Sequence, residues 1–298
     1  MTLDQLNMLV AVADQGTLKK ASEALFKTQP ALSQGLKQLE DRLQVELFNR
    51  EGYRLTLTSA GQQIYQQATR VLNESRTLSQ MAQHLAQGNE PLVKLTFEAS
   101  FDLQRILPAL ELTQNEFPHT RIVIQQEYVT GALEAVTNEQ TDLGITPVPG
   151  GLFETEPLDN VPLYKSGLVN VAAPRLLMKY PNLTSVQQLI NEYQLVIKDT
   201  GTGTKDFELG VQKGQRRWYV SDFGTKLDLI KSGMGWGKLP LTLIEEDLDK
   251  GHLERLALTD AYNWIDTEYH VIKLKHKVLG PVALKLWHNF QLLGQQNR

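Results

Sequence analysis

Residues 17–43 constrain the fold of this chain more than any other stretch: TLKKASEALFKTQPALSQGLKQLEDRL. Thr17 can cap a first short helix. Thr28 can cap a second one, which carries Pro30 in its first turn, where a missing N–H costs least. In the second helix four leucines recur at i, i+4, i+7 and i+11 and form one apolar stripe: Leu32, Leu36, Leu39 and Leu43. Two capped helices joined by a tight turn are typical of the helix-turn-helix, whose second helix enters the major groove of DNA. The alternative is an ordinary helical hairpin with one solvated face.

The literal sequence of this region favours DNA binding. It contains, in order and without gaps, TQPALS (28–33), LE (39–40), LFNR (47–50) and LTSAG (57–61). These pieces resemble the N-terminal domain of LysR-type transcriptional regulators. The resemblance implies an all-α winged helix-turn-helix domain over residues 1–58 that binds double-stranded promoter DNA, with RNA polymerase as a further partner. The sequence departs from the family pattern at Gln34, where arginine is common, and at Gly35, where a good helix former is common.

The expected DNA contacts lie on the polar face of the second helix and on a wing. Glu51-Gly52 stands between two short strand-like runs, which predicts a two-stranded wing. Residues 1–58 hold four Lys and three Arg against three Asp and four Glu, so affinity must come from a few placed cations and from base contacts. A nucleoid-type binder, the alternative, would need an excess of cations. The expected contacts are Thr28, Gln29, Pro30, Ser33, Gln34 and Lys37 on the helix, and Arg50 and Arg54 beside the wing turn.

One long helix is expected from Thr58 to Gly88, since Thr58 can cap its start and Gly88 can end it. Its apolar positions alternate steps of four and three, which is an a/d heptad seam with one polar interruption at Ser75. Such a seam most simply pairs with a second copy of the chain; the alternative is a helix packed on its own domain. We therefore expect residues 59–89 to form a linker helix, and the LysR resemblance implies a dimer or tetramer. The expected dimerisation residues are Ile64, Ala68, Val71, Leu78 and Leu85.

From Leu92 onward the pattern changes to alternating strands and helices, which predicts an α/β fold with a parallel sheet. Residues 162–174 are long enough to leave this sheet and start a second one, and residues 267–275 would return to the first. Pro281 would open a terminal helix. This layout resembles the two-subdomain, periplasmic-binding-protein-like effector domain of LysR-type regulators. We expect that domain at 90–298, with subdomain I at 92–162 and 267–298 and subdomain II at 163–266.

Short hydroxyl side chains recur where the expected strands end and helices begin. Free N–H groups at such junctions bind anions, which predicts a pocket between the subdomains for a small polar or anionic effector. The alternative is an effectorless regulator whose cleft is filled by its own side chains. Asp199-Thr200-Gly201 also matches the aspartic protease triplet, but no second copy exists to share a proton, so we expect no enzyme. The residues expected to line the pocket are Ser100, Phe101, Thr130, Thr146, Thr200, Thr202 and Phe223.

The composition excludes several kinds of site. The chain of 298 residues has no cysteine, which excludes disulfides and thiolate zinc sites, and its six histidines include no pair at i+3 or i+4. We therefore expect neither a metal site nor a cofactor. The net charge is −4, and no stretch approaches eighteen consecutive apolar residues. These features predict a cytoplasmic protein without a membrane partner.

Overall fold

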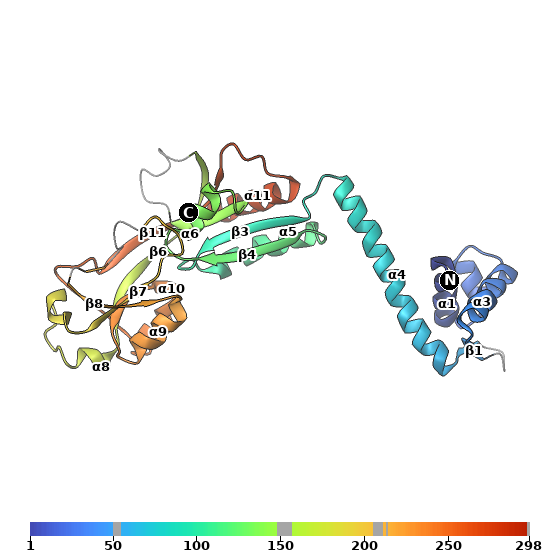
Figure 1. The fold of residues 1–298 in the computed structure, drawn as a ribbon, viewed down its shortest axis with the longest axis horizontal. Helices are drawn as coiled ribbons and strands as arrows, with labels where there is room; N and C mark the ends of the chain where they lie inside the picture. Colours follow the sequence, from blue (N-terminus) through green and yellow to red (C-terminus); the bar gives the residue numbers. More distant parts are fainter. Residues whose placement is uncertain (50–54, 148–156, 205–210, 213, 297–298) are drawn as a thin grey trace. The chain divides into compact units, whose positions relative to one another are not determined.

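The computed structural model describes residues 1–49, 55–147, 157–204, 211–212 and 214–296 (Figure 1). The chain forms two compact units, Met1–Gln87 and Gly88–Arg298. The helix expected as a separate linker segment at 59–89 therefore belongs to the N-terminal unit. None of the helices in these ranges combines the length and the apolar character needed to cross a membrane.

The N-terminal unit is a helical domain with a short hairpin, as the sequence predicts. Thr17, Thr28 and Thr58 each cap the helix that follows, their hydroxyls accepting hydrogen bonds from the backbone N–H groups three residues on. The leucine stripe of the third helix packs against the first helix and the hairpin in one core. The elements are α1 (Leu3–Gln15), α2 (Leu18–Ala24), α3 (Gln29–Leu43), β1 (Phe48–Asn49), β2 (Thr56–Leu57) and α4 (Ser59–Ala86).

Two glycines of this unit lie where another element comes too close for a side chain. A Cβ at Gly35 of α3 would lie 2.3 Å from the Sδ of Met8 on α1. A Cβ at Gly61, in the first turn of α4, would lie 2.1 Å from the carbonyl oxygen of Leu47. A backbone oxygen cannot move aside as a methionine tip can. The glycine of the LTSAG motif is therefore fixed by the approach of α4 to the hairpin.

The C-terminal unit contains a mixed sheet in the order β4-β3-β5-β11-β6-β9-β7-β8, with β10 beside β6. Its strands are β3 (Leu92–Glu98), β4 (Arg121–Glu127), β5 (Leu143–Pro147), β6 (Leu158–Ala172), β7 (Tyr193–Ile197), β8 (Arg216–Val220), β9 (Trp236–Pro240), β10 (Glu254–Arg255) and β11 (Trp264–Leu274). Its helices are η1 (Leu103–Ile106), α5 (Leu107–Glu116), α6 (Gly131–Thr137), α8 (Pro174–Leu177), η2 (Val186–Leu189), α9 (Phe223–Lys231), α10 (Leu241–Asp249) and α11 (Pro281–Gln296).

The expectation of two separate sheets is wrong. β3 pairs in parallel with β4 and β5, and β7 pairs in parallel with β8 and β9, as expected for two α/β subdomains. The long strands β6 and β11 pair with each other antiparallel and join both groups into one sheet. In the middle of the sheet only two strands pair with each other. There, residues 165–167 of β6 pair with residues 266–268 of β11, and the described pairings give neither segment another partner strand. The subdomains are thus connected by a two-stranded ribbon with a register shift between Tyr269 and His270.

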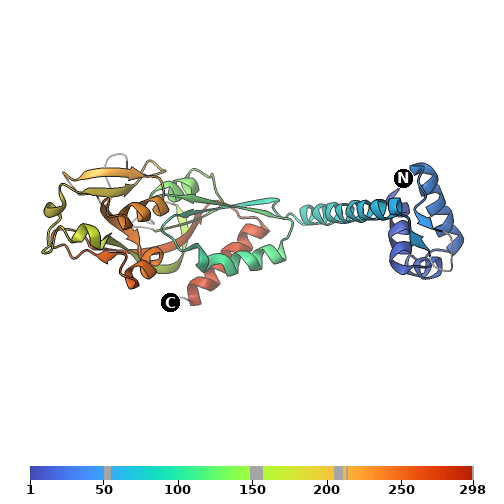
Figure 2. The same cartoon turned by 90° about the horizontal axis from the view of Figure 1, so that it is seen from below.

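Helices cover the sheet and enclose the cores of both subdomains. α5 and α11 lie side by side on one face of subdomain I (Figure 2) and bury Ile106, Leu286 and Phe290 against β3, β5 and β11. α9 and α10 cover β6, β7 and β9 in subdomain II and bury Ile230 and Ile244. The segments that follow the carboxyl ends of β4, β7 and β8 contact one another between the subdomains.

Candidate functional site

The polar face of α3 is exposed, as a DNA-reading face must be. Gln29, Gln34 and Lys37 are exposed, together with the capping residue Thr28 and with Pro30 in the first turn. Ser33 is half-buried. It borders a small cavity of about 180 Å³ that is otherwise lined by Leu18, Leu36, Phe48 and Leu55. Arg50, Arg54 and the Glu51-Gly52 turn lie outside the described residues.

The expected seam on α4 divides into two parts. Ala68 is 3% exposed and, with the half-buried Ile64, packs in the core of its own domain. Val71, Leu78 and Leu85 are 37%, 68% and 43% exposed. The C-terminal part of α4 extends beyond the other helices of its unit (Figure 1). The start of the expected seam is therefore part of the domain core. The apolar surface that could meet a second copy begins at Val71.

The end of β3 is closed by a buried network of polar side chains. The carboxylate of Glu98 accepts hydrogen bonds from the backbone N–H of Ser100 at 2.9 Å and of Val129 at 3.3 Å, and from the Ser100 hydroxyl. The Tyr269 hydroxyl in turn donates to Ser100 Oγ at 2.7 Å. Burial raises the pKa of the Glu98 carboxyl, although these hydrogen bonds oppose the rise. Ser100 thus has partners within the chain on both sides.

Two other expected pocket residues on subdomain I face inward. Phe101 is buried in the core, where its ring meets that of Tyr269 edge-on at 5.3 Å. Phe101 is therefore part of the core, as suits an aromatic ring directly after a buried strand, and its role as a wall of the pocket stays a prediction. Thr146 is also buried, and its hydroxyl donates to the Pro147 carbonyl at 3.3 Å.

The loop of residues 199–204, which we call the carboxylate loop, crosses from subdomain II to subdomain I. Asp199 accepts hydrogen bonds from the backbone N–H of Thr130 at 3.0 Å and from its hydroxyl at 2.8 Å. Glu134 of α6 accepts from the Gly203 N–H at 2.8 Å and the Thr202 hydroxyl at 3.1 Å. The Tyr128 N–H donates to the Thr200 hydroxyl at 2.9 Å.

The carboxylate loop thus brings together three of the residues expected to bind an effector: Thr130, Thr200 and Thr202. Their hydroxyls make hydrogen bonds inside the protein, so a role in effector binding stays a prediction. Burial alone would raise the pKa values of Asp199 and Glu134, but the hydrogen bonds they accept outweigh it and hold both below the usual range. Two carboxylates of the chain itself therefore lie at the start of α6, where the sequence predicts that an anionic effector binds.

Phe223 lies at the start of α9, and its ring centroid is 6.0 Å from that of Tyr128 on subdomain I. Beside it, the side chain of Lys226 is only 4% exposed. Its ammonium lies 5.9 Å from the Phe223 ring. Burial, and then the positive charge of Lys238, lower the pKa of Lys226 to about 7. Lys226 is not among the residues that the sequence predicts for the pocket. The signal that could have found it is a lysine on the apolar stripe of α9, one turn before the buried Ile230.

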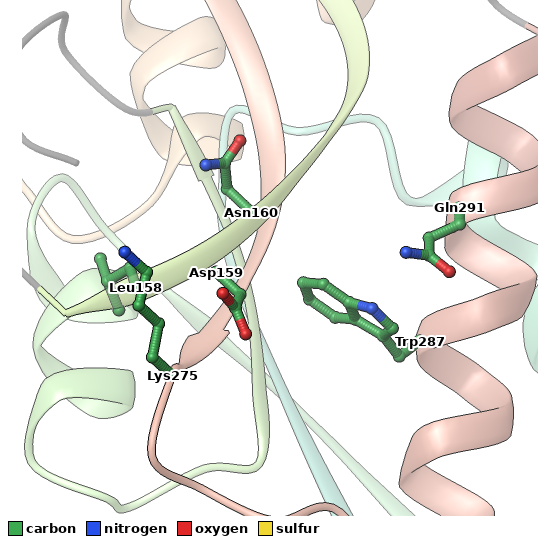
Figure 3. A pocket seen from close by; sticks show the side chains of 6 residues that line it. All are labelled: Leu158, Asp159, Asn160, Lys275, Trp287 and Gln291. Carbon is green, nitrogen blue, oxygen red and sulfur yellow. The ribbon is translucent and has the colours of Figure 1, made fainter.

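Subdomain I also carries a shallow surface pocket of about 440 Å³ between the start of β6 and α11 (Figure 3). Its lining is Leu158, Asp159, Asn160, Lys275, Trp287 and Gln291. Asp159 is already paired with Lys273, whose ammonium lies 2.6 Å from the carboxylate and 5.7 Å from the Trp287 ring. Within the described ranges no three His, Asp or Glu side chains are placed to hold a metal ion.

Comparison with known proteins decides the family. The family description "Bacterial regulatory helix-turn-helix protein, lysR family" matches residues 3–62, and "LysR substrate binding domain" matches residues 86–291. The chain belongs to the LysR family. It is a DNA-binding transcriptional regulator with an effector-binding domain, in a family of regulators and not of enzymes.

Relatives of this LysR-type regulator cover most of the chain. It is 28% identical over 255 residues to the HTH-type transcriptional regulator YeeY of Escherichia coli K12, a match that covers 84% of this chain and 81% of YeeY. It is 25% identical over 267 residues to the probable regulator YhaJ of the same organism, covering 89% of each. Full-length LysG of Corynebacterium glutamicum shares the fold with a TM-score of 0.50 and 21% identity, over 99% of this chain and 98% of LysG.

Proposed function

We propose that this LysR-type regulator reads a specific operator through the exposed face of α3. The observation that carries the proposal is the exposure of Gln34 and Lys37 on a helix whose opposite face is fixed in the domain core. A glutamine can bind adenine through two hydrogen bonds, which gives about 1–3 kcal/mol of discrimination between bases. Lys37 suits a phosphate, which adds affinity without sequence preference.

Paired substitutions separate these two roles. Gln34→Ala should relax sequence preference at one or two positions of a selected operator and leave binding to random DNA unchanged. Lys37→Ala should weaken binding to both kinds of DNA. It should also reduce by about one the magnitude of the slope of log K against the logarithm of the salt concentration. Operator and random duplexes are compared by fluorescence anisotropy across a salt series. Equal losses on both duplexes for both variants would contradict this division of roles.

We further propose that two copies pair through the exposed part of α4 from Val71 to Leu85. Apolar residues exposed seven positions apart suit a helical pair, and a dimer matches an operator of two half-sites. Val71→Glu with Leu78→Glu should split the dimer in sedimentation and abolish high-affinity operator binding. Gln80→Glu, a charge at an exposed position on the same part of α4 but outside the seam, serves as the control. Unchanged sedimentation of the double variant would exclude this interface.

The effector domain is proposed to respond to a small polar or anionic metabolite bound between the subdomains. A solved structure of LysG, 20% identical, carries arginine as its effector, and the site proposed here lies in the corresponding kind of domain. Ligand binding would shift a pre-existing equilibrium between arrangements of the two subdomains. We also propose that dimers assemble into tetramers, that the regulator contacts RNA polymerase, and that it acts in the cytoplasm.

An effectorless regulator is the second candidate, because one specific observation favours it. The carboxylate loop already links Asp199 and Glu134 to groups of the opposite subdomain. A protein of this second kind would show no change in thermal unfolding or operator affinity with any metabolite. A screen of cytoplasmic anions against thermal unfolding separates the two candidates.

A further inference from the structure

The effector cleft contains two places where a fold of this kind offers N–H groups to an anion, and the chain's own acids use both. At the start of α6, Asp199 accepts from Thr130, and its hydrogen-bond set is completed by the Gly201 N–H at 2.9 Å and the Thr204 hydroxyl at 2.7 Å. At the end of β3, Glu98 accepts from Ser100 and Val129. At the start of α6 the wall on subdomain I therefore carries the carboxylates of Asp199 and Glu134, whose pKa values are lowered, and an anionic ligand would meet repulsion there.

The wall on subdomain II is different, because it contains a buried cation that has no acidic partner among the residues the structure describes. The Lys226 side chain is 4% exposed, and in the described ranges it makes no ion pair. Lys226 is in the first turn of α9, and helical side chains incline toward the N-terminus of their helix. Its ammonium accordingly lies beside Phe223, the residue whose ring meets Tyr128 of the opposite subdomain. The cation thus lies one aromatic ring away from the boundary between the subdomains.

The backbone beneath Lys226 is shaped to hold its side chain. A Cβ at Gly237 of β9 would lie 3.2 Å from Lys226 Cε and 2.7 Å from the Leu195 carbonyl oxygen. A side chain at Gly237 would therefore clash with the Leu195 carbonyl oxygen and crowd the Lys226 side chain. A buried ammonium is unfavourable without a counter-charge, and Lys238 on the same strand adds a second positive charge nearby.

We infer that the Lys226 ammonium is the anion-binding group of the effector cleft, and that it takes the carboxylate or phosphate of a small ligand whose body lies against Phe223 and Tyr128. This inference rests on the proposed function, since it gives the effector cleft its chemistry. The ligand supplies the counter-charge that no described residue of the chain supplies, and the aromatic rings supply apolar surface. The anion is placed on subdomain II, opposite the acidic wall of subdomain I.

The test uses the full-length protein and three substitutions on α9. Lys226→Met removes the cation, Lys226→Arg retains the charge, and Lys231→Met removes a charge that is exposed and paired with Asp247 at 2.5 Å. Sodium phosphate, succinate and benzoate are titrated at constant ionic strength against chloride, each as a separate probe. All four tryptophans lie between residues 218 and 287, so the fluorescence-detected unfolding temperature reports the C-terminal unit alone.

At least one of the three anions should raise the unfolding temperature of the wild type. Its apparent affinity should fall at least tenfold in Lys226→Met and stay within twofold of wild type in Lys231→Met. Lys226→Arg should retain more of the response than Lys226→Met. An equal response of wild type and Lys226→Met overturns the inference, and so does a wild type that responds to none of the probes. Specific operator binding, measured separately, would then still support the proposed function. If specific operator binding is absent while the anion response depends on Lys226, the proposed function is contradicted and the inference about Lys226 is not.

Discussion

Replacing Lys226 by methionine should stabilise the C-terminal unit, and the gain should depend on pH. The pKa of Lys226 is lowered in the folded protein from 10.5 to about 7, first by burial and then by Lys238. At 1.36 kcal/mol for each pKa unit, the folded state loses about 5 kcal/mol when the ammonium is charged. A buried methionine fills a comparable volume and carries no charge to desolvate.

The sign of the pH dependence follows from proton binding. Between about pH 7 and pH 10.5 the unfolded chain holds a proton on Lys226 that the folded chain does not, so wild-type stability rises with pH in this window. The cost of the buried ammonium is fully present below about pH 7 and fades toward pH 10.5. The stability advantage of Lys226→Met should therefore be about 5 kcal/mol at pH 6 and about 2 kcal/mol at pH 9.

Urea unfolding followed by tryptophan fluorescence measures this difference in the C-terminal unit at both pH values. Lys231→Met is the matched control. It lies on the same helix, but its ammonium is exposed and ion-paired, so its effect should stay within about 1 kcal/mol and show no decline of this kind. An advantage of Lys226→Met that is equal at pH 6 and pH 9 would refute the reasoning. A variant less stable than wild type at pH 6 would refute it as well.

Two further substitutions test close contacts of the fold. Gly61→Ala should destabilise the N-terminal unit by about 2–4 kcal/mol, because its Cβ would meet the Leu47 carbonyl oxygen at 2.1 Å. Unfolding followed by circular dichroism measures this loss, with Gln62→Ala at an exposed position as the control. Equal stabilities of the two variants would contradict the prediction. Asp199→Asn should lower the stability of the C-terminal unit at pH 7, and the difference from wild type should shrink as pH falls through about 4, since the lowered pKa of Asp199 gives stability that acid removes. Fluorescence-detected urea unfolding at pH 7 and pH 3.5 measures it, and a difference that grows in acid would show that the carboxylate does not act through its hydrogen bonds to Thr130.

The sequence predicts the N-terminal unit well because its signals are local. A capping threonine and the leucine stripe act within one helix turn or one helix face, so their spacing alone determines helix limits and buried side. Ala68 follows the same heptad spacing as Leu78, yet it is buried in its own domain, where the half-buried Ile64 also packs. Spacing shows that a face is apolar; it does not show which partner covers it.

The C-terminal unit is predicted less well because its decisive contacts join distant residues. β9 contains Gly237 and Pro240 and follows directly on Gly235, which argues against a strand. Both glycines lie against backbone oxygens, those of Tyr193 and Leu195, and allow β7 to approach closely. Neighbouring residues alone do not reveal that approach.

The effector cleft shows the same difficulty. The hydroxyl of Thr130 is placed correctly at the start of α6, but Asp199, its partner, comes from the opposite subdomain. The sequence predicts hydroxyls at the cleft without showing that the chain supplies the acid they bind.

The ribbon formed by residues 165–167 and 266–268 determines how the two subdomains can move. Ladder hydrogen bonds resist sliding of one strand past the other, whereas a two-stranded ribbon twists more readily than a wide sheet. A change in the angle between the subdomains would therefore twist this ribbon, which is bounded on one side by the register shift between Tyr269 and His270. A ligand that changed this angle would have to supply the elastic energy of the twist, and that energy would return the subdomains to their starting angle when the ligand leaves.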